Sequence, residues 1–100
     1  MAHFAQLNDQ SKVIQVCVVD NSVLLDAEGL EHEALGIAYL RSIFGQNTQW
    51  RQTSYNNRFR VRYAGLGMQY NEMYDAFIPM QPGPDWVFDH EQLDWKPISE

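Results

Sequence analysis

Only one stretch of this sequence has apolar side chains at helical spacing, and it lies between residues 30 and 44. Leu30, Ala34, Ile37 and Phe44 fall on one face of a helix with 3.6 residues per turn. Gly45 follows, at a position where glycine commonly ends a helix. The rest of the chain has short, alternating or β-branched runs that are typical of strands, so we predict an α+β fold.

The strand-like segments before and after this helix are best paired as antiparallel hairpins. Residues 3–7 (HFAQL) and 12–20 (KVIQVCVVD) are separated by the turn formers NDQS and predict an N-terminal hairpin. Residues 12–20 are apolar on both faces, so we expect a central strand that is covered on both sides. Residues 48–54 and 58–64 flank the turn formers YNN and predict a second hairpin.

The C-terminal third of the chain predicts two further hairpins. One places Tyr70 opposite Phe77, and the other places Trp86 or Phe88 opposite Trp95. A stiff connector with three prolines and a glycine, residues 79–85, lies between them. We expect an antiparallel sheet of short hairpins, one packed helix and a C-terminal hairpin arm. At 100 residues this is a single domain, 1–100, with a sheet-and-helix core over 1–79 and a Pro-linked hairpin over 80–100.

Basic charge is concentrated in one segment of an acidic chain. The formal net charge is −6, yet residues 51–70 contain four arginines and no acidic residue. In a strand over residues 58–64, Arg58, Arg60 and Arg62 would share one face. We therefore expect a row of guanidinium groups that pairs with carboxylates, either of the same fold or of a neighbouring subunit.

The arginines also lie among Tyr55, Phe59 and Tyr63, a composition that resembles strand faces binding single-stranded nucleic acid. The net charge of −6 disfavours this interpretation, because acidic segments on both sides would repel a phosphate backbone. Nucleic acid is therefore not an expected partner. A membrane is not expected either, because no apolar run approaches the ~20 residues that a span requires.

Sequence motifs for catalysis or metal binding are absent. No G-x-S-x-G, glycine-rich phosphate loop or H-E-x-x-H occurs, and His3, His32 and His90 lack the spacing of zinc ligands. The single cysteine, Cys17, lies in an apolar run, which predicts a buried thiol and excludes an intrachain disulfide. We expect no enzyme activity, no catalytic or metal-binding residue and no cofactor.

The C-terminal third is rich in large apolar groups beside prolines. If these groups do not all fit into a small core, they form an exposed patch that binds a partner; the alternative is a separate mini-core. The predicted partner-binding residues combine the arginines with the rings of this region: Arg51, Arg58, Arg60, Arg62, Tyr63, Phe77, Trp86 and Trp95.

The start MAHFA, the segment EALGIAYLRSIFG, the phrases QTSYN and YAGLG and the ending with DAFIP occur in this order between Met1 and Pro97. Together they resemble small proteins of marine bacteriophages, notably cyanophages. The ending is similar to segments of tail-fibre and other virion-associated proteins. Arg62, Met80 and Gly83 depart from the pattern of the family, which affects the expected surface rather than the expected fold.

The resemblance implies a non-enzymatic virion structural or accessory protein, in capsid decoration or in the tail or tail fibre, that acts through protein–protein contacts. The expected partners are other phage structural proteins and further copies of the same chain. The expected locations are the virion and, during assembly, the host cytoplasm. The alternative is an early phage protein that binds a host factor and alters its activity, because a small acidic protein can occupy a basic surface.

Overall fold

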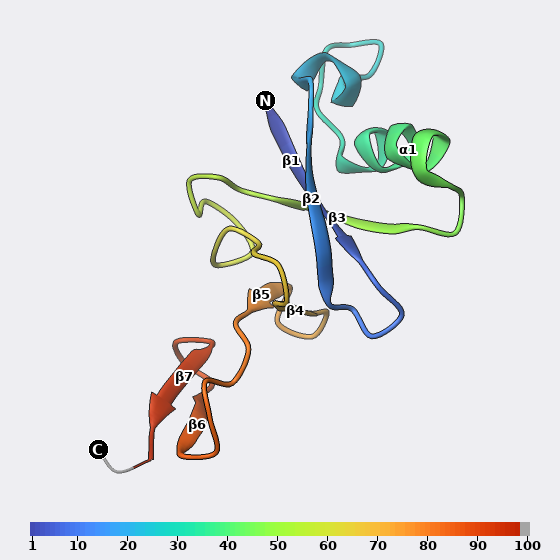
Figure 1. The fold of residues 1–100 in the computed structure, drawn as a ribbon. Helices are drawn as coiled ribbons and strands as arrows, with labels where there is room; N and C mark the ends of the chain where they lie inside the picture. The colour runs from blue at the N-terminus through green and yellow to red at the C-terminus, as the bar shows by residue number, and fades with distance from the viewer. Residues whose placement is uncertain (99–100) are drawn as a thin grey trace.

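The computed structural model describes residues 1–98, which form one α-helix, one short 3-10 helix and seven strands (Figure 1). This confirms the predicted α+β fold with antiparallel hairpins and a packed helix. In chain order the elements are β1 (Ala2–Leu7), β2 (Val13–Val19), η1 (Asn21–Leu24), α1 (Glu33–Phe44), β3 (Gln49–Thr53), β4 (Gln69–Asn71), β5 (Ala76–Ile78), β6 (Trp86–Asp89) and β7 (Asp94–Pro97).

The largest sheet has three antiparallel strands in the order β2-β1-β3. The N-terminal hairpin is confirmed, but the prediction that residues 12–20 form the central strand is wrong. β1 takes that place because β3 returns to pair with it, and Phe4 and Ala5, on its opposite faces, are both fully buried. β2 is an edge strand, and its Ile14 and Val18 are about half exposed.

Helix α1 and η1 cover the face of this sheet that carries Phe4. The core there contains Phe4, Leu24, Leu40 and Trp50. Gly36 faces the Phe4 ring so closely that a Cβ at this position would collide with it, so glycine sets the spacing of helix and sheet. The predicted helix is confirmed, although it starts at Glu33 rather than Leu30.

The late start of α1 has a local cause. The Asp26 carboxylate accepts hydrogen bonds from the backbone N–H groups of Glu28 and Leu30, and the His32 N–H donates to the Leu24 carbonyl. These bonds hold residues 26–32 in a turn that competes with the first helical turn. The hydrogen bond from the Leu30 N–H is the main cause that lowers the pKa of the Asp26 carboxyl below its ordinary value. The hydrogen bond with His32 lowers it further.

The β4–β5 hairpin covers the other face of the sheet. Its Tyr70 and Phe77 are paired across the strands as predicted, with ring centroids 5.3 Å apart. They form a second core with residues of the sheet and of the loop before β4: Ala5, Leu7, Val13 and Ala64. One hairpin and one helix therefore sandwich the central strand.

Residues 58–64 do not form a strand, so the predicted second hairpin and the single-faced arginine row are wrong. Arg60 and Val61 both have left-handed backbone angles, with φ of 53° and 70°. Side chains replace the ladder hydrogen bonds that a strand would make: Asn57 accepts from the Tyr63 N–H, and Thr53 accepts from the Ala64 N–H. The arginines consequently point toward different parts of the molecule.

The predicted C-terminal hairpin arm forms from β6 and β7, and Phe88 lies opposite Trp95. It lies at the far end of the molecule from α1 (Figure 1). The long axis measures 53 Å against 25 and 20 Å for the others. The radius of gyration is 15.1 Å, whereas a compact domain of this length has about 13 Å. The arm therefore extends the molecule instead of joining its main core.

Candidate functional site

Arg60 binds carboxylates of its own chain. Its Nη1 donates to Glu33 Oε2 at 2.6 Å, and its Nε donates to Asp75 Oδ1 at 2.8 Å. Burial alone lowers the pKa of this guanidinium, but the hydrogen bonds to Glu33 and Asp75 outweigh it, so the pKa is raised overall. Arg60 therefore stays charged and ties the loop before β4 to the start of α1 and to the β4–β5 turn.

Two other arginines of the predicted set also bind within the chain. Arg51 pairs with Glu72 at 3.3 Å and lies over the Tyr70 ring, 5.2 Å from its centroid. Arg62 donates to the carbonyl oxygens of Phe77 and Gln92, and so links the body to the arm. The sequence left open whether the arginines pair with carboxylates of the same fold or of a neighbouring subunit. Arg51 and Arg60 pair with carboxylates of the same fold.

Arg58 differs from the other three arginines. Its side chain makes no ion pair or hydrogen bond with residues 1–98 and is exposed. It lines a hollow of about 200 Å³ beside His3, Tyr55 and Phe59. The rings of His3, Tyr55 and Tyr63 pack on one another there, with centroid distances of 5.4 to 5.6 Å. Arg58 and Tyr63 thus remain candidate partner-binding residues.

The predicted aromatic partner-binding residues have separate locations. Phe77 is fully buried, so its side chain is part of the core and does not face a partner. Trp86 and Trp95 are half-buried, and Trp95 Nε1 donates to the Pro79 carbonyl at 2.7 Å. Of these three rings, only Trp95 lines a second cavity, larger than the hollow beside Arg58.

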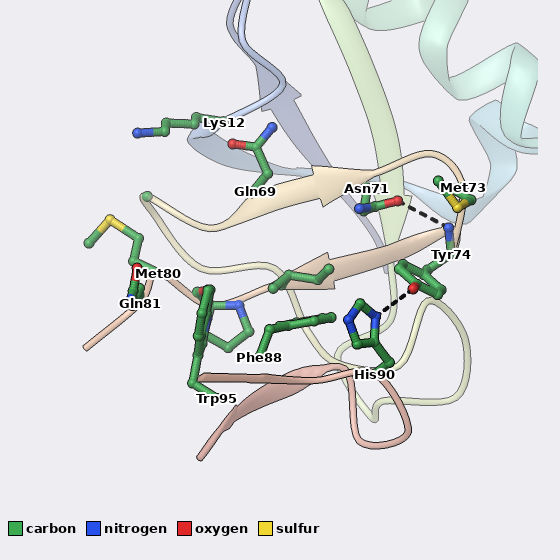
Figure 2. Close-up of a pocket in the computed structure, with 13 residues that line it drawn as sticks. Lys12, Gln69, Asn71, Met73, Tyr74, Met80, Gln81, Phe88, His90 and Trp95 are labelled. Carbon is green, nitrogen blue, oxygen red and sulfur yellow. Dashed lines mark hydrogen bonds between the residues drawn. The ribbon is translucent and has the colours of Figure 1, made fainter. Parts of the chain in front are cut away.

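That cavity is an open groove of about 610 Å³ between the β4–β5 hairpin and the arm (Figure 2). We call it the hairpin groove. Most of its surface is apolar, and its large apolar side chains come from the β4–β5 hairpin, the connector and the arm: Met73, Tyr74, Ile78, Met80, Phe88 and Trp95. Its volume lies in the range of sites that bind small molecules.

The walls of the groove are held in place by contacts between its own side chains. The Tyr74 hydroxyl lies 2.7 Å from His90 Nδ1, a contact that joins the two hairpins at one end (Figure 2). The Phe88 ring packs edge-on against Trp95 at 5.3 Å and against His90 at 4.9 Å. These contacts preorganise the groove before any partner binds.

The opposite end of the groove carries polar and flexible groups. Lys12, Met80 and Gln81 lie there in Figure 2. The Lys12 ammonium has no carboxylate within 4.0 Å in the described part of the chain, and Met80 is 62% exposed. The apolar groove therefore has at this end an ammonium group that forms no ion pair within residues 1–98.

Sequence reasoning missed Met73, Tyr74, Met80 and His90 as candidate site residues. No local pattern marks them, because the groove arises from the relative placement of two hairpins joined by a connector. The available signal was the concentration of apolar groups beside prolines in residues 75–86, which includes Met80 and which contributed to the prediction for Trp95.

Other kinds of site receive no support from the geometry. Within residues 1–98, no three His, Cys, Asp or Glu side chains gather in a way that could hold a metal ion. The described helices include none that is both long and apolar enough to cross a membrane. Cys17 is partly buried, and burial raises the pKa of its thiol above the ordinary value, which disfavours the reactive thiolate.

Comparison with models of protein families, with curated proteins and with solved structures gave no match for this chain. The resemblance to marine bacteriophage proteins therefore stays a prediction. The functional interpretation follows from the hairpin groove itself.

Proposed function

We propose that this protein is a non-enzymatic bacteriophage virion protein that binds other virion proteins through the hairpin groove. The observation that supports a binding role is the groove itself, with its methionine and aromatic walls open to solvent. Aromatic residues and methionine are enriched at protein interfaces, and methionine adapts its shape to different partners. The phage assignment rests on the resemblance of residues 1–97 to marine phage proteins.

The distribution of polar groups favours a protein partner over a small substrate. The side chains of Tyr74 and His90 are hydrogen-bonded to each other, and Asn71 Oδ1 accepts a hydrogen bond from the Tyr74 N–H at 3.1 Å. These groups therefore stabilise the groove and do not converge on a common point where a reacting atom could lie. Apolar contact is what the groove offers to a partner.

The partner segment is expected to have apolar side chains followed by a carboxylate. Met73 and Met80 are 85% and 62% exposed, so their side chains remain in water until a partner covers them. Lys12, at the end of the groove, would bind the carboxylate. The groove therefore predicts the chemistry of the partner's surface: apolar side chains and a carboxylate.

Mass spectrometry of purified virions tests the proposal. A phage that encodes the chain should carry it in its particles, and the double substitution Met73→Glu and Met80→Glu should remove it from them, because two buried carboxylates would oppose binding. Leu30→Glu is the matched control, since Leu30 is also 62% exposed but lies outside the groove. Particles that lack the wild-type chain would rule out a virion role.

The alternative is an early phage protein that binds a host factor. The net charge of −6 favours it, since an acidic protein can occupy a basic surface of a host protein. A stoichiometric host protein recovered from a lysate, combined with virions that lack the chain, would support this alternative over the virion role.

A further inference from the structure

The two edges of the three-stranded sheet are built differently. At the β3 edge, the N–H of Gln52 donates to Glu33 Oε2 at 2.6 Å, and its carbonyl accepts from Arg60 Nη1 at 2.7 Å. A charged pair thus occupies backbone groups that an added strand would need. Charged side chains at a sheet edge are one way in which proteins prevent further strand pairing.

The β2 edge is covered only at its beginning. Val13 exchanges two backbone hydrogen bonds with the loop before β4, to the Met68 carbonyl at 2.8 Å and from the Gly67 N–H at 2.9 Å. Within residues 1–98, the backbone of residues 14–19 makes hydrogen bonds only to β1. β2 contains no charged residue and no proline, and its one register irregularity lies at residues 13–15, so residues 15–19 form a regular stretch of free edge.

The side chains along this free edge are apolar. Ile14 and Val18 are 49% and 52% exposed, and Val16 lies on the same face as Val18. Val18 lies beside His3 in the ladder, and the Tyr55 and Tyr63 rings pack on His3. An uncharged, apolar edge strand next to aromatic rings is a surface suited to a further strand.

We propose that β2 is the edge through which two copies of this chain associate, antiparallel and centred on Val16. The register pairs Val16 with Val16 of the second copy and brings Val18 of each copy close to Ile14 of the other, so that the half-exposed groups cover each other. The pairing is limited to residues 14–18 of each copy, because residues 67–68 already occupy the edge at Val13, where β2 begins. The two three-stranded sheets then form one six-stranded sheet across a two-fold axis.

A second copy is the occupant because an uncharged, apolar strand is complementary to itself in an antiparallel pair. Each chain has a net charge of −6, which opposes self-association over most of the surface. β2 is an uncharged strip on which two copies can meet without opposing like charges. The pairing is independent of the proposed function, because the β2 edge and the hairpin groove use different side chains. Absence of the chain from virions would therefore leave the proposed pairing unaffected.

Sedimentation and light scattering of the purified chain test this pairing. The wild type should have the mass of a dimer at micromolar concentrations, and Val18→Lys and Ile14→Lys should each weaken dimerisation about tenfold or more. Ile43→Lys is the matched control, since Ile43 is 56% exposed on α1, and it should leave the dimer intact. A monomeric wild type, or a Val18→Lys variant that dimerises as the wild type does, would overturn the proposal.

A cross-link tests the register even if the lysine variants do not fold. Residues directly opposite each other in antiparallel strands have Cα atoms about 4.5 to 5.5 Å apart, within the range of disulfides. Val16→Cys in a Cys17→Ser background should therefore form a disulfide-linked dimer on mild oxidation. Ile43→Cys in the same background should stay monomeric. A Val16→Cys variant that gives no more cross-linked dimer than this control would overturn the proposed pairing.

Discussion

At the scale of single residues, Arg60 and Arg58 show that neighbouring arginines in one segment have different roles. The Arg60 side chain is 14% exposed and is bonded to Glu33 and Asp75, whereas the Arg58 side chain is exposed and makes no such contact with residues 1–98. An arginine that pairs internally stabilises the fold, and one that does not is available to a partner.

This difference predicts unequal effects of alanine substitution. Arg60→Ala leaves a half-buried Glu33 carboxylate without its partner and should lower the free energy of unfolding by about 2–3 kcal/mol. Arg58→Ala should change it by less than about 0.5 kcal/mol. Urea unfolding of both variants measures these values, and equal losses would contradict the assignment of Arg60 to the fold.

Gly36 predicts a substitution that is unfavourable although it raises helix propensity. Gly36→Ala would gain about 1 kcal/mol in propensity but brings a Cβ into the ring of the fully buried Phe4. We expect a net loss of stability of about 1–3 kcal/mol from overpacking. Phe4→Leu in the Gly36→Ala background should be less harmful than Phe4→Leu alone, and additive losses in thermal unfolding would refute the proposed contact.

Asp75 predicts part of the acid sensitivity of the protein. Hydrogen bonds from the Tyr70 hydroxyl and then from Arg60 lower the pKa of this carboxyl below its ordinary value. The ionised form therefore adds stability above the unfolded pKa, about 3.9, and this stability is lost as the pH falls through the folded pKa. Asp75→Asn should flatten the decrease in stability below about pH 4. An unchanged pH profile in urea unfolding would contradict this role.

At the scale of elements, the arm is attached to the body by a few directed contacts. Trp95 Nε1 donates to the Pro79 carbonyl, Arg62 donates to the Gln92 carbonyl, and the Tyr74 hydroxyl contacts His90. The position of β6 and β7, and with it the width of the hairpin groove, depends on these bonds.

Removing one bond should therefore loosen the arm and leave the sheet intact. Trp95→Phe keeps an aromatic ring but loses the indole N–H, so amide hydrogen exchange in residues 86–97 should become faster while that of β1 stays unchanged. Trp86→Phe is the control, because the Trp86 indole makes no hydrogen bond within residues 1–98. Equal exchange in the two variants would show that the Trp95 bond does not hold the arm.

The elements that could be predicted from the sequence are those set by local pattern. The helical spacing of residues 30–44, the NDQS turn and the Tyr70–Phe77 pair each depend on neighbours in sequence. The segment 58–64 alternates like a strand, but Arg60 binds Glu33, 27 positions away, and that contact fixes a different backbone. Strand order and the hairpin groove likewise depend on long-range placement, which no local pattern contains.

At the scale of the whole molecule, the fold separates two surfaces. The sheet and helix form the compact part, with the uncharged β2 edge on one side. The arm extends the molecule to 53 Å and creates the hairpin groove where it meets the body. The self-association that we propose for β2 and the partner binding that we propose for the groove use separate surfaces, so neither blocks the other.

Photo-cross-linking inside assembled virions identifies the protein that lies against the hairpin groove. A photoreactive amino acid placed at Met80, in the groove, should cross-link the chain to a different virion protein, whereas the same group at Leu30 should not. A virion in which position 80 gives no cross-link to another protein, or no more than position 30 does, would contradict the assignment of the hairpin groove as the partner-binding site.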